Sequence, residues 1–170
     1  LIRALAHSAP FPLPSVRSVV FGGEALRPAH LVDLKSKLPH ARQYINGFGP
    51  TECTVVCQAY FEIDDYREGD IGHPVDGVEI SVDSQTGRLT LISDRLALGS
   101  LDAVHAAAFS LSGGRRTFRT GDAVTQAADG RLSYVGRLDG RAKVRGLFVD
   151  LRSVEAALEA SPGVTTGFAA

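Results

Sequence analysis

The sequence predicts an α/β protein: a parallel strand-helix-strand part, a small antiparallel β-barrel, and the start of a carboxyl-terminal α+β subdomain. Two changes in the hydrophobic pattern support this. Up to about residue 60, a β-branched run, a helical repeat of leucines and a second apolar run follow one another. Short alternating runs between turn signals come next, and a hairpin pattern precedes a helical repeat at the end. We therefore expect three parts, at residues 1–60, 61–138 and 139–170.

The first part predicts one strand-helix-strand unit. Residues 15–21 form a β-branched run that meets the tight turn Gly22-Gly23. A helix should follow, because Pro28 suits a first turn and leucines recur at helical spacing up to Pro39. Residues 42–46 then form a second strand, parallel to the first. The turns after both strands should emerge at the carboxyl edge of the sheet, where open α/β sheets bind ligands.

Shorter sequence patterns predict the elements of the second and third parts. Four β-type runs, which predict a small antiparallel sheet or barrel, lie at residues 78–82, 88–92, 117–119 and 132–135. Residues 142–144 and 147–149 flank a turn and predict a hairpin. One face of a following helix is marked by Leu151, Val154, Ala157 and Leu158.

Composition excludes several classes of protein. The chain has 170 residues, of which 44% are hydrophobic, enough for a packed core. Its 18 basic and 19 acidic residues nearly cancel, so we expect neither nucleic acid nor a membrane surface as a partner. No apolar run approaches the roughly 20 residues of a membrane span. Cys53 and Cys57 lack a metal or disulfide motif, which favours reduced thiols and a cytoplasmic protein. The absence of Met suggests a piece of a longer polypeptide.

The most informative segment runs from Asn46 to Glu52. Its two glycines allow a ligand to approach the backbone closely, and Phe48 offers a flat face for a base. Thr51 and Glu52 can contact phosphate and Mg²⁺ respectively. The segment therefore predicts a nucleotide-binding loop, although Glu52 taken alone is equally well explained as a solvated carboxylate.

This segment resembles the motif Asn-x-Tyr-Gly-Pro-Thr-Glu of the adenylate-forming enzymes, above all the adenylation domains of nonribosomal peptide synthetases. Phe48 stands where Tyr is usual. Three further segments resemble family motifs and appear in the family's order, at residues 22–26 (Gly-Gly-Glu-x-Leu), 118–122 (Tyr-Arg-Thr-Gly-Asp) and 136–146 (Gly-Arg-x-Asp-x-Gln-Val-Lys-Ile-Arg-Gly). Each alone is commoner as a turn or a solvated hairpin. Their order and spacing identify the chain as an internal fragment of such a domain.

The resemblance implies a binding site for ATP and Mg²⁺. In the family, the Thr that matches Thr51 contacts phosphate and the Glu that matches Glu52 holds the metal, so these two are the candidate catalytic residues. The Asp that matches Asp122 binds the two ribose hydroxyls, and the Arg that matches Arg137 approaches the ribose or phosphate. The full set of implied nucleotide contacts is Gly22, Gly23, Glu24, Asn46, Gly47, Phe48, Asp122 and Arg137.

The resemblance also implies an acyl pocket and a hinge. Asp139 matches the residue about which the family's carboxyl-terminal subdomain rotates, and Arg141 stands where Gln is usual. The pocket would bind an apolar side chain, and the residues that match its lining are Val20, Gly22, Gly47, Val55 and Val56.

The implied activity is ATP-dependent formation of an acyl-adenylate from a small carboxylic or amino acid. The acyl group would then pass to the phosphopantetheine arm of a carrier protein, among neighbouring synthetase domains. The family's phosphate loop and its carboxyl-terminal Lys are not in this segment, so we expect the segment alone to be inactive. Two alternatives stay open: a degenerate or excised adenylation-like segment with a structural or docking role in a megasynthetase, and an acyl-CoA synthetase relative.

Overall fold

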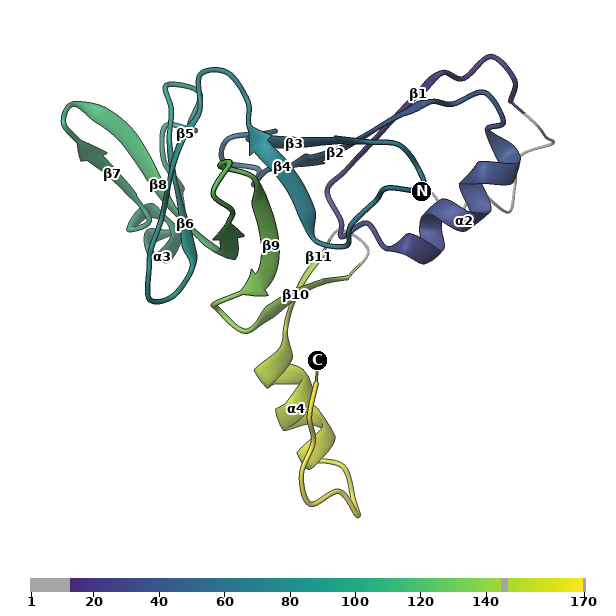
Figure 1. Cartoon of the computed structure of the whole chain (residues 1–170). Helices are drawn as coiled ribbons and strands as arrows, with labels where there is room; N and C mark the ends of the chain where they lie inside the picture. The colour runs from purple at the N-terminus through teal and green to yellow at the C-terminus, as the bar shows by residue number, and fades with distance from the viewer. Residues whose placement is uncertain (1–12, 145–146, 170) are drawn as a thin grey trace.

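The computed structural model describes residues 13–144 and 147–169 (Figure 1). In chain order, the elements are β1 (Ser18–Gly22), α2 (Pro28–Lys37), β2 (Gln43–Phe48), β3 (Cys57–Phe61), β4 (Asp70–Pro74), β5 (Glu79–Val82), β6 (Arg88–Ile92), α3 (Ala103–Ala106), β7 (Phe109–Ser112), β8 (Arg115–Gln126), β9 (Leu132–Arg137), β10 (Arg141–Val144), β11 (Leu147–Asp150) and α4 (Leu151–Glu159). Within the described residues, strands β1 to β9 form one sheet, and β10 pairs only with β11.

The predicted parallel strand-helix-strand unit is confirmed. β1 and β2 are parallel, with Val20 beside Ile45 and Gly22 beside Gly47. Pro28 lies in the first turn of α2, and the helix ends at Lys37. One face of the two strands and α2 enclose a core made of Phe21, Leu26, Leu31, Leu34, Leu38 and Tyr44. This core fixes the helix on one side of the sheet and leaves the carboxyl ends of β1 and β2 at a common edge.

The second part is antiparallel, as predicted, but a closed barrel is not confirmed. The strand order is one succession, β1-β2-β3-β4-β9-β8-β6-β5, with β7 added beside β8. β4 pairs with both β3 and β9, so the antiparallel strands extend the first sheet. Register shifts in the β4-β9, β6-β8 and β8-β9 pairs interrupt the ladders, and such bulges bend and twist a sheet. The result is a mixed sheet with few helices.

A second core fills the antiparallel part. Its fully buried members include Val56, Cys57, Leu89, Leu91 and Leu132, which come from the loop before β3 and from strands β3, β6 and β9. The sheet crosses the boundary expected at residue 60, because β3 spans it and pairs with β2 and β4.

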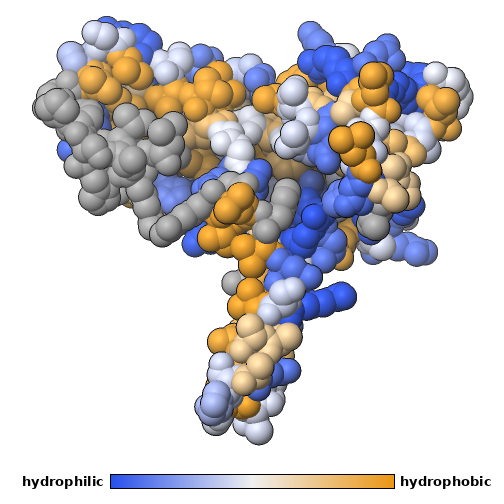
Figure 2. All heavy atoms as spheres, turned by 180° about the vertical axis from the view of Figure 1, so that it is seen from behind, coloured by the Kyte–Doolittle hydropathy of each residue, from blue (hydrophilic) through white to orange (hydrophobic). Residues whose placement is uncertain are grey.

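The carboxyl-terminal segment is a hairpin followed by a helix, as predicted. β10 and β11 are antiparallel. The Asp150 side chain accepts a hydrogen bond from the Arg152 backbone N–H (3.0 Å) and so caps the start of α4. No residue of α4 is buried, and the helix projects away from the sheet (Figure 1). From behind, this segment stands out from the rest of the molecule with apolar residues on its surface (Figure 2).

Candidate nucleotide site

The segment after β2 folds tightly back on itself. The Val56 N–H donates to the Phe48 carbonyl (2.8 Å), and the Cys53 N–H donates to the Pro50 carbonyl (3.1 Å). A Cβ at Gly49 would overlap the Thr54 carbonyl oxygen, so this approach requires glycine. Thr54 has a φ of 59°, a strained value for a β-branched residue. Strain of this kind persists only where surrounding contacts hold the backbone.

This turn leaves Thr51 exposed and Glu52 half-buried. The Glu52 carbonyl accepts a hydrogen bond from the Ala97 N–H (2.7 Å), which ties the turn to the segment after β6. The backbone of Glu52 is therefore anchored while its carboxylate stays available. That is the arrangement expected of a group that receives a ligand.

The first half of the predicted loop belongs to strand β2. Asn46 is buried, and its side-chain amide donates to the Asp70 carbonyl (2.8 Å) in the neighbouring region of β4. Phe48 is half-buried against Tyr134 of β9, with 5.8 Å between ring centroids and 45° between the rings. Asn46 thus anchors β2 through a buried hydrogen bond, whereas Phe48 is the last residue of the strand. The sequence analysis did not identify Tyr134 as a contact of Phe48. Tyr134 lies two residues after Leu132 in β9, so both side chains face the same, core side of the strand.

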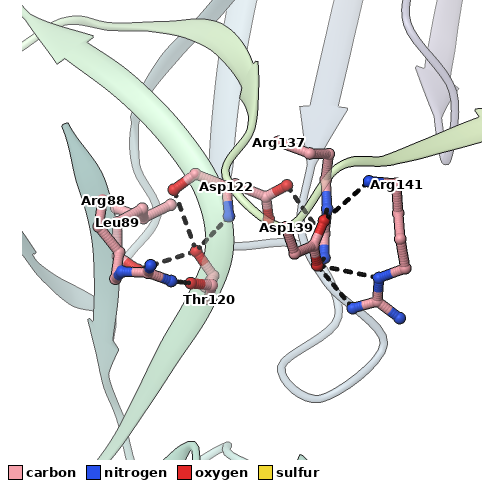
Figure 3. Close-up of polar contacts among 7 residues, drawn as sticks. All are labelled: Arg88, Leu89, Thr120, Asp122, Arg137, Asp139 and Arg141. Carbon is pink, nitrogen blue, oxygen red and sulfur yellow. Dashed lines mark hydrogen bonds and ion pairs between the residues drawn. The ribbon is translucent and has the colours of Figure 1, made fainter. Parts of the chain in front are cut away.

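Asp122 and Arg137 meet across strands β8 and β9. They are register partners, and Arg137 Nη1 donates to Asp122 Oδ1 over 3.0 Å (Figure 3). The Asp122 side chain is only 8% exposed, and that of Arg137 is 15% exposed. A Cβ at Gly121 would overlap the Arg137 guanidinium, so Gly121 lets this side chain lie flat on the turn. The two groups predicted to contact the ribose are therefore brought together.

Thr120 secures the backbone that carries Asp122. Its hydroxyl donates to the Leu89 carbonyl (2.8 Å) and accepts from the Asp122 N–H (3.1 Å) (Figure 3). Arg88 donates from Nη1 to the Thr120 carbonyl (2.8 Å). Thr120 is 1% exposed, so these bonds are protected from water. The motif reading treated Thr120 only as part of a turn.

Asp139 accepts hydrogen bonds from two arginines. Arg137 donates from Nε to Asp139 Oδ1 (3.0 Å), and its Nη2 also pairs with Asp139 Oδ2. Arg141 donates from Nε (2.9 Å) and Nη2 (2.7 Å) to the same Oδ2. Although partial burial opposes ionisation, these hydrogen bonds hold the pKa of Asp139 well below its usual range.

Burial has the opposite outcome at Asp122. Desolvation raises the pKa of the Asp122 carboxyl, and the positive charge of Arg137 offsets this only in part. The negative charges of Asp139 and Glu52 raise that pKa further. Phe48 contacts Tyr134 of β9, the strand that carries Arg137, so the end of β2 lies close to the strand pair that holds Asp122. The fold thus unites two motifs that lie 70 residues apart in the chain.

The residues predicted to line an acyl pocket divide into two groups. Phe21 points into the core beneath α2, so its neighbours Val20 and Gly22 lie on the opposite face of the sheet. Gly47 lies beside Gly22 on that face, and Val55 follows the loop, with its methyl groups 3.7 Å from where a Cβ of Gly47 would lie. Val20 and Val55 are 67% and 39% exposed, which leaves them available to a ligand.

Val56 differs from that group because it is fully buried in the core of the antiparallel part. Gly23 and Glu24 lie in the exposed turn after β1, at the edge shared with the end of β2. The φ of 87° at Gly23 is one that glycine accommodates readily. A polar cavity of about 630 Å³, bounded in part by Arg67, Asp70 and Arg131, includes none of the predicted site residues.

Neither a membrane-spanning helix nor a cluster of metal-binding side chains occurs in the described parts of the chain. In residues 13–144 and 147–169, no helix has the length and apolar character needed to cross a membrane. Nor do any three His, Cys, Asp or Glu side chains of these ranges gather in a way that could hold a metal ion.

The chain is similar to known adenylation proteins. The model of the AMP-binding enzyme family matches residues 1–91. Phosphinothricin tripeptide synthetase PhsC of Streptomyces viridochromogenes is 36% identical over 170 aligned residues, which cover 91% of this chain and 15% of PhsC. The chain thus spans only a small part of the length of curated relatives such as PhsC.

Solved structures agree with this similarity. The structure of PA1221, a nonribosomal peptide synthetase protein containing adenylation and PCP domains, superimposes with a TM-score of 0.74 at 28% identity, over 97% of this chain and 37% of that one. The Vibrio cholerae adenylation domain AlmE, solved with glycyl-adenosine-5'-phosphate, gives a TM-score of 0.72 at 28% identity, over 93% of this chain and 34% of AlmE. The chain therefore belongs to the AMP-binding enzymes, as part of an adenylation domain of the nonribosomal peptide synthetase type.

Proposed function

We propose that the complete protein containing this chain uses ATP to activate a small carboxylic or amino acid as an acyl-adenylate. One observation carries the proposal: Phe48, at the end of β2, contacts Tyr134 of β9, and Arg137 of the same strand donates a hydrogen bond to Asp122. With Glu52 in the turn that follows Phe48, a carboxylate for a metal, a carboxylate for a diol and a guanidinium would face one region. This combination suits a nucleotide with its divalent ion.

The nucleotide would be held by groups of different chemistry. Asp122 accepts from Arg137 through Oδ1, and a carboxylate retains further lone pairs for the hydroxyls of a ribose. Phe48, backed by Tyr134, would stack on adenine beside the turn at Gly22 and Gly23. The exposed hydroxyl of Thr51 would contact phosphate. Together these contacts would orient the α-phosphate for attack.

Mg²⁺ fits this donor set through Glu52. The ion commonly binds one or two protein carboxylates and takes its other ligands from phosphate oxygens and water. Glu52 would supply a protein carboxylate, because the turn after β2 leaves it half-buried next to the exposed Thr51. Bound Mg²⁺ supplies neutralisation of phosphate charge.

The acid would lie on the sheet face opposite α2. Val20 and Val55 make this face apolar, and Gly22 and Gly47 keep it open. The acid carboxylate would attack the α-phosphorus and pyrophosphate would leave, giving the acyl-adenylate. A carrier thiolate would then attack the acyl carbonyl and AMP would leave. Similarity to PA1221, which contains adenylation and PCP domains, supports a carrier protein as the acceptor.

Movement of the carboxyl-terminal segment would separate the two steps. Asp139 precedes the separate β10-β11 sheet, and Gly140 has a φ of 69°. We propose that the 139–170 segment pivots here between adenylation and thioester formation. The absence of buried residues in α4 leaves this helix few contacts to break on moving.

Exchange of labelled pyrophosphate into ATP by the complete polypeptide tests the proposal. We expect acid-dependent exchange with at least one member of a panel of amino and aryl acids. No exchange with any acid, in a polypeptide that is folded, would contradict the activity and favour a scaffold. Replacing the carrier protein with free coenzyme A then distinguishes a synthetase module from an acyl-CoA synthetase.

A further inference from the structure

Arg141 contacts the carboxylate of Asp139 in three places. Its backbone N–H donates to Oδ1 (3.2 Å), and its guanidinium donates from Nε (2.9 Å) and Nη2 (2.7 Å) to Oδ2. Arg141 opens strand β10, and the bend at Gly140 brings its side chain back toward Asp139. Asp139 and Arg141, which lie two residues apart in the chain, therefore form a compact ion pair at the start of the hairpin.

The same carboxylate orients Arg137. Nε of Arg137 donates to Asp139 Oδ1 (3.0 Å), and Nη2 pairs with Oδ2, which together form a two-point contact. Because the guanidinium is planar, this contact fixes the plane of the whole group. The remaining nitrogen, Nη1, then lies 3.0 Å from Asp122 Oδ1. The direction of Arg137 toward Asp122 thus depends on where Asp139 lies.

Exposure decreases along this series of charges. The side chains of Arg141 and Asp139 are 30% and 29% exposed, whereas those of Arg137 and Asp122 are 15% and 8% exposed. Alternating charges thus lead from the surface to a buried carboxylate (Figure 3). Without the Arg141 guanidinium, Asp139 would lose two of its charged contacts, and Arg137, which also contacts Asp122, would be the one guanidinium left to hold it. Asp139 could then turn toward water and take Arg137 with it.

We propose that Arg141 is a positioning residue for the nucleotide site, which holds Arg137 against Asp122 by holding Asp139. The inference rests on the proposed function, because it is the ribose of ATP that Asp122 and Arg137 would contact. Arg141 itself acts through Asp139 and is not assigned a contact with the nucleotide. A glutamine at this position would keep the backbone hydrogen bond to Asp139. It would remove the Arg141 guanidinium, so Arg137 would supply the remaining positive charge beside Asp139.

The test is ATP binding by the complete polypeptide, measured by titration calorimetry. We expect Arg141→Gln to weaken ATP binding about three- to five-fold, which is the range of a partly exposed ion pair. Arg141→Lys, which keeps the charge without the two-point geometry, should lie between Arg141→Gln and the unchanged protein. The matched control is Arg115→Gln, because Arg115 pairs with Glu79 over 2.7 Å at an exposed end of β8. This control should bind ATP like the unchanged protein.

A double variant separates positioning from general support of the fold. If Arg141 acts through Asp139, Arg141→Gln should have no further effect on ATP affinity in an Asp139→Asn background. Pyrophosphate exchange should show a higher KM for ATP with an unchanged KM for the acid. Unchanged ATP affinity in Arg141→Gln, full additivity in the double variant, or an equal rise in both KM values would each overturn the inference. If the unchanged polypeptide binds no ATP at all, the proposed function itself fails, and that result needs no variant.

Discussion

Arg137 and Asp122 face each other as register partners on β9 and β8, with 3.0 Å between Nη1 and Oδ1. The pair is largely shielded from water, since the two side chains are 15% and 8% exposed. Charged groups placed in this way are costly to bury and need partners. Here the partners are themselves the groups proposed to receive a ribose.

Replacing Asp122 with Asn tests the ribose contact. The amide keeps the size of the side chain but removes the charge, and a hydrogen bond to a charged group contributes about 1.5–3 kcal/mol. We therefore expect about a 10- to 100-fold rise in the KM for ATP in pyrophosphate exchange by the complete polypeptide. Asp129→Asn, in the exposed turn between β8 and β9, is the control. An Asp122→Asn protein that binds ATP normally would exclude this role.

Replacing Glu52 with Gln tests the metal contact. The side chain keeps an oxygen but loses its charge, so the Mg²⁺ concentration for half-maximal exchange should rise by roughly ten-fold. The backbone hydrogen bond from Ala97 to Glu52 is retained, so thermal stability should change little. Glu68→Gln, at an exposed position, should leave the Mg²⁺ titration unchanged. An identical Mg²⁺ titration for Glu52→Gln and Glu68→Gln would remove Glu52 from the metal site.

Replacing Gly49 with Ala tests the tight turn after β2. The added Cβ would overlap the Thr54 carbonyl, and relieving such overpacking costs about 1–3 kcal/mol. The variant should unfold at a lower denaturant concentration and lose exchange activity. Gly99→Ala is the matched control, because no atom lies within 4 Å of its added Cβ, and it should stay within about 0.5 kcal/mol. Equal stability of the two variants would show that the turn accommodates a side chain.

Replacing Thr120 with Val tests the support beneath Asp122. The change leaves the Leu89 carbonyl and the Asp122 N–H without their partner in a buried place, which costs about 1–3 kcal/mol. The KM for ATP should rise together with the loss of stability, measured by urea unfolding. Thr125→Val on the same strand is exposed and should change neither quantity. A stability loss without any change in the KM for ATP would separate Thr120 from the site.

The pH dependence of stability tests Asp139. Its folded-state pKa lies below the ordinary 3.8, so the ionised carboxylate stabilises the fold at and above pH 3.8. That contribution should disappear as the pH falls from 3.8 through the lower folded-state pKa. The difference in free energy of unfolding between the unchanged protein and Asp139→Asn should therefore be full at neutral pH and vanish in strong acid. A difference that is independent of pH would show that the charge of Asp139 contributes nothing.

Local sequence patterns predicted much of the secondary structure of this protein and its family motifs. Pro28, the leucines of α2 and the β-branched run before Gly22 encode helix and strand through neighbours in the chain, and the structure confirms them. Parallel pairing followed from the helical connection alone. Four motifs in order were also sufficient to indicate the family, because each is a short run of side chains whose chemistry does not depend on the rest of the fold.

Only the tertiary structure decided how these pieces meet. Val56 and Val55 are adjacent in sequence, yet Val56 is fully buried and Val55 is exposed, because the chain turns between two different environments. The union of β3, β4 and β9 into one extended sheet, and the contact of Arg141 with Asp139, depend on register and on side-chain direction. The sequence predicted most of the elements, but not β3, β4, β7 or α3, and it predicted the chemistry of the motifs. Packing between residues distant in the chain determined which charges share one site. The energy of these long-range contacts arises only when the elements come together.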